Sequence, residues 1–387
     1  MHRRPGPWPS AISPNTTGIA VRGGAVAGRA LAVAVLVLAA LLPFAAGTGR
    51  AVASGTPPVP LAQNAANPLA ARPWGVYTGP ADSVYPAWQQ ATGADKELLA
   101  KVALRARVRW LGTWIPAGQI AAKIQQYVAQ AQAGDPDVVV PMAIFRLWPH
   151  GEGAKSQPVT AAQQRAYRAW IDQAAAGIGA ARVAMVLEPD LAVALTGWRP
   201  AVRMKLASYA ASVFSALPHT TVYLDAGDAD WLPVDRAVAM LTRAGVAKVR
   251  GFALGATHYG SLASEVGYGQ QLVSALAGAG LGTKHFVVDT ADNGKPFTFS
   301  QYWAAHPHGD FDAAQACRTT AETHCVTLGV PPTWQVANSR WGLSRSLRAA
   351  AARSADGYLW FGRPWLYRQA APFLLNRTLQ VARTTPY

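Results

Sequence analysis

Val183-Ala-Met-Val-Leu-Glu-Pro-Asp190 is a run of apolar residues that ends in a carboxylate, a proline and a second carboxylate. Because the run is apolar without alternation, it predicts a strand that is buried on both faces. Pro189 has no amide hydrogen to donate, so it ends the pairing with a neighbouring strand. Glu188 and Asp190 are therefore expected at the carboxyl end of a core strand, where α/β folds place their chemistry. A turn with two solvated acids is the alternative interpretation of this stretch alone.

Strands and helices alternate along most of the chain. Further strands are predicted at residues 73–77, 108–112, 138–147, 220–225, 249–254, 285–289 and 357–361. Helices are predicted at residues 117–133, 160–176, 202–216, 234–244, 262–277 and 344–352. This alternation indicates parallel strands joined by right-handed crossovers. Seven or eight such units predict a single-domain α/β fold, a distorted parallel β/α barrel.

Ionisable residues follow several predicted strands at the point where each strand ends. They are Arg146, Asp190, Asp225, His258, Asp289 and Arg363. Because the carboxyl ends of the strands of a parallel barrel meet at one rim, these side chains predict a functional site there. No GxGxxG or GxxxxGK pattern follows any predicted strand, which argues against a nucleotide or dinucleotide enzyme.

Composition limits the class of protein and its partners. Of the 387 residues, 51% are hydrophobic and 14% are charged, which favours a large core over disorder. The net charge is +15, and residues 1–53 contribute five arginines and no acid, which leaves 30 basic against 20 acidic residues, or +10. This excess of positive charge favours binding to an anionic cell wall or membrane surface. No basic cluster interleaved with aromatic residues occurs, so no nucleic-acid partner is predicted.

The N-terminus has the pattern of a secretory signal peptide, predicted at residues 1–53. Arg22 and Arg29 precede an apolar run at residues 30–42, and Ala51-Val-Ala53 offers a cleavage site. The run is short for a membrane span, so no stable insertion is expected after cleavage, with an uncleaved anchor as the alternative. Residues 54–66 are predicted to be a flexible lead-in and residues 67–387 the folded domain. The mature protein is expected outside the cell, with retention at the cell surface as an alternative.

Two cysteines, Cys317 and Cys325, lie close enough in sequence to close a small loop by a disulfide in an extracellular protein. They lie within residues 295–333, a long connection of the kind that is usually functional or disordered. His306-Pro-His-Gly-Asp310 in the same connection has a metal-binding alternative, but its proline and glycine suit a plain loop. No metal site and no cofactor are predicted.

Six segments resemble glycoside hydrolase family 6, the inverting cellulases, and they occur in that family's order. The segments are Val186-Leu-Glu-Pro-Asp-Leu-Ala192, Val222-Tyr-Leu-Asp-Ala-Gly-Asp-Ala-Asp-Trp-Leu232, Gly251-Phe-Ala-Leu254, Phe286-Val-Val-Asp-Thr-Ala-Asp-Asn-Gly294, Leu328-Gly-Val-Pro-Pro-Thr333 and Tyr358-Leu-Trp360. The resemblance implies that Asp190 is the general acid. Burial and a neighbouring carboxylate would raise its pKa so that it can donate a proton. Glu188 is expected to have a structural role, and Asp225 either tunes the acid or orients a loop.

Two departures from the family pattern concern the water-activating group. Residues 145–153 lack the family's Arg-Asp-Cys, and Glu152 aligns onto its Asp only with a shift of one residue, with a plain loop acid as the alternative. The family's proposed base falls near Arg368, which cannot accept a proton. Glu152 or Asp225 is therefore predicted to assist Asp190, unless hydrolysis has become slow or has been lost.

Sugar binding is expected to rest on one tryptophan and two polar side chains. The resemblance makes Trp231 a platform for a sugar ring, because a flat indole covers the apolar face of a pyranose. His258 and Arg363 complete the predicted substrate-binding set, and a structural histidine is the alternative for His258. A disulfide within residues 295–333 is expected to stiffen a loop over the cleft, which is expected to be open.

The sequence thus predicts a secreted, monomeric, endo-acting hydrolase that cleaves β-1,4-glucan, as polysaccharide or oligosaccharide, with inversion. Two alternatives remain: a glycan-binding protein on the same scaffold that has lost hydrolysis, and a hydrolase of a different, cell-derived β-glucan.

Overall fold

The computed structural model of the protein describes residue 64, residues 66–148 and residues 155–387. The predicted signal peptide and Glu152 lie outside these residues, so both stay predictions. The strands are β1 Arg109–Gly112, β2 Val140–Phe145, β3 Val183–Leu187, β4 Thr220–Asp225, β5 Gly251–Leu254, β6 His285–Asp289 and β7 Ala355–Leu359. The helices are α1 Tyr85–Gln90, α2 Gly93–Ala103, α3 Ala117–Gln132, α4 Ala161–Ile178, α5 Pro200–Ser215, α6 Val234–Ala244, α7 Leu262–Gly278, α8 Phe299–Ala305, α9 Arg345–Ser354 and α10 Leu375–Thr384.

The strands form one parallel sheet in the order β1 to β7, which curls into a distorted barrel. Its two edges meet in a single parallel bridge between Arg107 and Trp360. There the Val108 amide donates to the Trp360 carbonyl at 2.8 Å, and the Trp110 indole donates to the Phe361 carbonyl at 2.7 Å. The predicted fold class is confirmed, and the described sheet has seven strands.

The predicted strand at residues 73–77 is wrong. This segment forms one isolated bridge, between Trp74 and Val139, and joins no ladder. Pro73 has no amide hydrogen to donate. A Cβ at Gly75 would lie only 2.9 Å from the Ala131 carbonyl oxygen, so the close approach to α3 requires glycine there.

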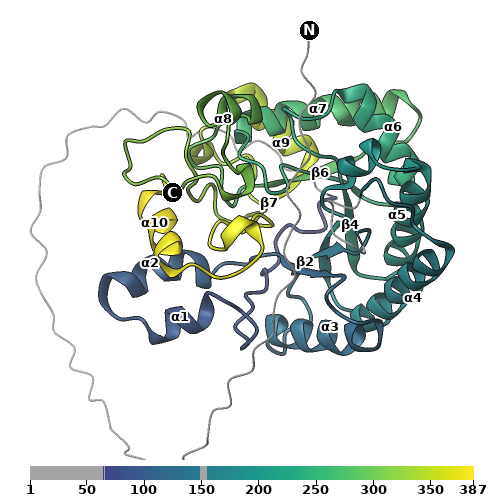
Figure 1. The fold of residues 1–387 in the computed structure, drawn as a ribbon, viewed down its shortest axis with the longest axis horizontal. Coiled ribbons are helices and arrows are strands. Elements are labelled where there is room, and N and C mark those ends of the chain that lie inside the picture. The colour runs from purple at the N-terminus through teal and green to yellow at the C-terminus, as the bar shows by residue number, and fades with distance from the viewer. Residues whose placement is uncertain (1–63, 65, 149–154) are drawn as a thin grey trace, which may run out of the picture. The chain divides into compact units, whose positions relative to one another are not determined.

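The apolar run that begins at Val183 forms β3, as predicted, and all five residues of this strand are buried. Val183, Met185 and Leu187 belong to the core between the sheet and the surrounding helices. Ala184 and Val186 point the other way and pack inside the barrel. Helices α3 to α6 follow one another around the outside of the strands (Figure 1). Because β3 is buried on both faces, it is held firmly within the sheet. Asp190 follows its last residue closely and therefore lies at the carboxyl rim of the barrel.

A second core lies beside the barrel and was not predicted. It is formed by α1, α2, α10, the connection of residues 295–333 and the segment between β7 and α10, with buried residues such as Val102, Phe311, Trp365 and Val381. Figure 1 shows α1, α2 and α10 grouped together, away from α3 to α6. None of the helices in the described part of the chain is long and apolar enough to cross a membrane.

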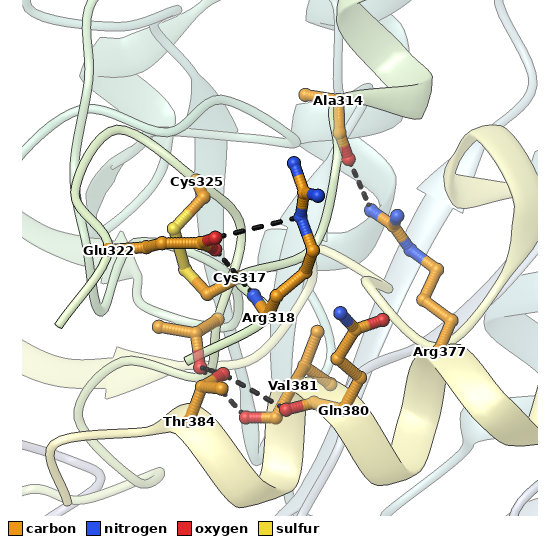
Figure 2. Close-up of a disulfide and its surroundings, with 10 residues drawn as sticks. Ala314, Cys317, Arg318, Glu322, Cys325, Arg377, Gln380, Val381 and Thr384 are labelled. Atoms are coloured by element: carbon orange, nitrogen blue, oxygen red, sulfur yellow. Dashed lines mark hydrogen bonds and ion pairs between the residues drawn. A yellow bond between two sulfur atoms is a disulfide. The ribbon is translucent and has the colours of Figure 1, made fainter. Parts of the chain in front are cut away.

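The predicted disulfide between Cys317 and Cys325 is confirmed, with Cα atoms 5.0 Å apart. The segment that follows its loop is held to α10, because the Thr327 hydroxyl donates to the Val381 carbonyl at 2.8 Å. Figure 2 shows α10 alongside the loop. The described contacts of the loop therefore brace the second core, whereas the sequence predicted a loop stiffened over the cleft.

Replacing Cys317 and Cys325 together by serine is expected to lower the free energy of unfolding by about 2–3 kcal/mol, the loop-entropy value for a short closed loop. Thermal unfolding with and without reductant measures this. The native protein should lose stability in reductant, and the double variant should be insensitive to it. Equal stability of both proteins without reductant would contradict a stabilising role.

Candidate active site

The turn after β3 has an unusual backbone. Glu188 and Asp190 both have positive φ angles, 54° and 64°, on either side of Pro189. Non-glycine residues rarely adopt this conformation, which costs on the order of 1–3 kcal/mol each and is kept where surrounding structure enforces it. Asp190 ends this turn at the rim and is partly exposed.

Glu188 enforces that turn. One of its carboxylate oxygens accepts the amides of Arg146 (3.0 Å) and Leu147 (2.9 Å), and the other accepts the Tyr167 hydroxyl at 2.6 Å. Burial raises the pKa of Glu188 to about 7, against the effect of these donors. Glu188 thus ties the end of β3 to the segment after β2, which is the structural role predicted for it.

Asp190 is the electrostatic centre of the rim. Its charge raises the pKa of Asp225 and of Asp312, and it favours the cationic forms of His258 and Arg363. Asp225, His258 and Arg363 are three of the residues that the sequence placed at strand ends. The structure thus brings these three side chains within electrostatic range of Asp190, and their role in a functional site stays a prediction.

Asp225 lies at the end of β4 and is 0% exposed. Burial, reinforced by the charge of Asp190, raises its pKa well above the ordinary aspartate value. The amides of Gly227 and Leu191 approach the carboxyl group, but neither reaches full hydrogen-bond geometry. Burial and the nearby Asp190 therefore favour the protonated form of Asp225, which lies away from solvent.

His258 lies between two carboxylates. Its Nδ1 atom is 3.8 Å from Asp228 Oδ2 and 3.8 Å from Asp230 Oδ1. Burial would lower the pKa of His258, but the two acids outweigh it and raise the pKa to about 9. The ring is therefore an imidazolium at neutral pH. Its face stacks on Trp231, with centroids 5.3 Å apart and an interplanar angle of 10°.

Asp228, Asp230 and His258 are also the described residues placed to hold a metal ion, since their ligand atoms lie within 4.8 Å of one another. The positive charge of the His258 imidazolium already offsets negative charge of Asp228 and Asp230 in this cluster. In the other segment with a metal-binding interpretation, residues 306–310, Asp310 pairs with Arg368 Nε at 3.0 Å.

Arg363 brings a cation to the same rim. Its guanidinium carbon lies 4.1 Å from the centroid of the Trp110 ring. Burial lowers its pKa to about 9, while the charges of Asp190 and Asp289 oppose that shift, so the group stays cationic at neutral pH. Asp289 accepts the amides of Ala291 (3.0 Å) and Phe361 (3.3 Å), which fixes the ends of β6 and β7 together.

Some predicted residues are not part of this centre, and one residue in it was missed. Arg146 lies near Glu188, and burial lowers its pKa. Glu152 is outside the described residues. Asp312, which feels the charge of Asp190, was not predicted, because it lies in a long connection and follows no strand directly. The signal in the sequence is that two acidic residues, Asp310 and Asp312, lie two positions apart in that connection.

A parallel barrel that carries carboxylates around an aromatic ring at its carboxyl rim is the arrangement of a glycan-cleaving enzyme. The model of Glycosyl hydrolases family 6 matches residues 75–341, and the chain belongs to that family.

Relatives with known names agree with this assignment. The chain is 35% identical over 221 residues to Endoglucanase A of Cellulomonas fimi, covering 57% of this chain and 47% of that protein. It is 32% identical over 229 residues to Endoglucanase 1 of Streptomyces halstedii, covering 57% and 69%. The chain thus spans about half the length of the Cellulomonas relative.

A similar solved structure is that of the endoglucanase Cel6 from Mycobacterium tuberculosis, in complex with methyl-cellobiosyl-4-deoxy-4-thio-β-D-cellobioside. It has a TM-score of 0.65 and 26% identity, and the match covers 82% of this chain and 99% of that chain. The Orpinomyces sp. Y102 family 6 enzyme, with a TM-score of 0.60 and 19% identity, supports the fold.

Proposed function

We propose that this protein is a secreted endo-acting hydrolase that cleaves β-1,4-linked glucan with inversion at the anomeric carbon. The observation that carries the proposal is Asp190, a partly exposed carboxyl group on a constrained turn, surrounded by one buried acid and two cations. The names of the relatives and the cello-oligosaccharide analogue held by the Mycobacterium tuberculosis structure support glucan as the substrate class.

Asp190 is the proposed general acid, which protonates the glycosidic oxygen as the bond to the anomeric carbon breaks. Asp190 and Asp225 repel each other when both are ionised, so Asp225 is proposed to raise the pKa of Asp190 and help keep the acid protonated. Glu152 stays the other candidate helper. Trp231, backed by the stacked His258 ring, is proposed as a sugar platform. Arg363 is proposed to bind sugar hydroxyl groups beside Asp190.

The alternative of a glycan-binding protein has one observation in its favour. Arg368 is a cation in an ion pair with Asp310, at the place where the resemblance puts a base. Binding without cleavage would need only the platform and the polar rim residues, which this structure retains.

Incubation of the purified protein with cellohexaose, followed by NMR, distinguishes these functions. We expect new reducing ends that appear first as the α-anomer, before mutarotation. The β-anomer appearing first would contradict inversion. Intact cellohexaose that nevertheless binds in calorimetry, with binding weakened by Trp231→Ala, would favour the glycan-binding alternative. Neither binding nor cleavage would indicate a different glycan.

A further inference from the structure

The connection after β6 brings one more carboxylate to the rim. Asp312 lies in a single 3-10 turn, Phe311–Ala313. The Phe311 carbonyl accepts the Tyr259 hydroxyl at 3.0 Å, and the Phe311 ring meets the His258 ring edge-on at 5.3 Å. On its other side, Asp310 pairs with Arg368 at 3.0 Å. The turn that carries Asp312 is thus fixed to residues of the site.

The other acids around Asp190 are already engaged or buried. Asp225 is 0% exposed, Asp289 is 2% exposed and accepts backbone amides, and Asp292 is 1% exposed and accepts the Gln369 amide at 2.6 Å. Asp228 and Asp230 face His258, and Asp310 pairs with Arg368. A carboxylate that activates water needs both a free oxygen and access to solvent.

Asp312 meets both requirements. It is partly exposed, and in the described part of the chain it forms no hydrogen bond and no ion pair. We propose that Asp312 is the general base of this enzyme, the carboxylate that takes a proton from the attacking water. This inference rests on the proposed glucan hydrolysis and assigns the role that neither Arg368 nor the buried Asp225 can fill.

The ionisation of Asp312 suits this role. Burial and the charges of Asp190 and Asp310 raise its pKa to about 6, while the cations His258 and Arg368 oppose the rise. The group is therefore a carboxylate at neutral pH and still a stronger base than an ordinary aspartate. A base is most effective when its pKa lies near the working pH.

The step balances without any other reactant. The water oxygen bonds to the anomeric carbon as the bond from that carbon to the glycosidic oxygen breaks. One water proton passes to Asp312, and the Asp190 proton passes to the departing oxygen. The products are a sugar with an α-hydroxyl and a shortened chain with a free 4-hydroxyl. Asp312 then releases its proton to solvent and Asp190 takes one up, which restores both groups.

Azide rescue tests the assignment, because azide is an anion that attacks without losing a proton. Asp312→Ala is expected to lower kcat for cellohexaose at least about a hundredfold. Sodium azide should restore cleavage and give an α-glycosyl azide, seen by NMR and mass spectrometry. The isosteric Asp312→Asn should lose as much activity. In the native enzyme, kcat/KM should fall as pH drops through about 6, because Asp312 becomes protonated.

The outcomes separate this inference from the proposed function. A native protein that does not cleave any β-glucan would overturn both. An active native enzyme whose Asp312→Ala and Asp312→Asn variants keep full kcat would overturn the base assignment alone. Loss of activity in Asp312→Ala without any azide product would also overturn the base assignment and would give Asp312 a positioning role. Azide rescue of Glu152→Gln with an unaffected Asp312→Ala would move the role to Glu152.

Discussion

Asp190→Asn should lower kcat for cellohexaose about a thousandfold, the usual contribution of a positioned acid, while leaving the protein folded. The sugar alkoxide is a poor leaving group, so its departure depends on a proton from Asp190. Asparagine keeps the size of the side chain but has no proton to donate. It also tolerates the left-handed backbone at this position, where φ is 64°, better than most residues do.

The leaving group distinguishes loss of the acid from general damage. A 2,4-dinitrophenyl β-cellobioside releases a stable phenolate, so Asp190→Asn should hydrolyse it within about tenfold of the native rate, because acid assistance is hardly needed there. Asp312→Asn should be impaired on both substrates, because attack by water still needs a base. Steady-state kinetics on the two substrates measures the contrast.

The matched control is Asp235→Asn, the same substitution at an exposed acid in the first turn of α6. Its rates should equal those of the native enzyme on both substrates. An equal loss on cellohexaose and on the dinitrophenyl substrate in Asp190→Asn would refute its role as proton donor. Such a result would instead point to a damaged substrate site.

The sequence predicted those parts of the fold that one strand or helix encodes by itself. β3 is apolar on both faces, so its burial and the position of Asp190 followed directly. The predicted ends of β2 were wrong: the strand was expected at residues 138–147 and spans Val140–Phe145. Val138, Val139 and Leu147 are buried core residues, but they lie outside the strand. An apolar run shows which residues are buried, but not how many of them find a partner strand.

The rest of the site depends on packing between distant segments. The sequence leaves open whether Asp225 tunes the acid or orients a loop, and only its complete burial shows that its pKa is raised. Asp312 reaches the rim because Phe311 packs against His258 and Asp310 pairs with Arg368, contacts that span 53 and 58 residues respectively. No local pattern encodes such contacts, and loops carry no periodicity that would place them.

Asp356→Ala should cause the largest loss of stability, about 3–5 kcal/mol in the free energy of unfolding, as expected when one partner of a buried ion pair is removed. Asp356 lies in β7 and is 0% exposed. Its Oδ2 atom accepts Arg250 Nε at 2.8 Å and the Tyr223 hydroxyl at 2.7 Å, and its Oδ1 atom accepts Arg250 Nη2 at 3.0 Å. Alanine would leave a half-buried guanidinium and a buried hydroxyl without their acceptor.

This cluster lies at the opposite end of the barrel from the catalytic rim, because Asp356 is near the start of β7 and Arg250 precedes β5. Residues at the amino ends of barrel strands serve stability, so folded Asp356→Ala should keep the native kcat. Asp137 is the matched control, since it also pairs with two arginines, Arg72 at 2.8 Å and Arg182 at 3.0 Å, but its side chain is 62% exposed.

Asp137→Ala should therefore cost no more than about 1 kcal/mol, because solvent screens exposed ion pairs. Urea denaturation of both variants and the native protein gives the comparison directly. Equal losses in the two variants would mean that burial does not set the strength of the Asp356 cluster. A large loss in Asp356→Ala alone would show that burial makes this carboxylate a strong link between β7, Tyr223 of β4 and Arg250.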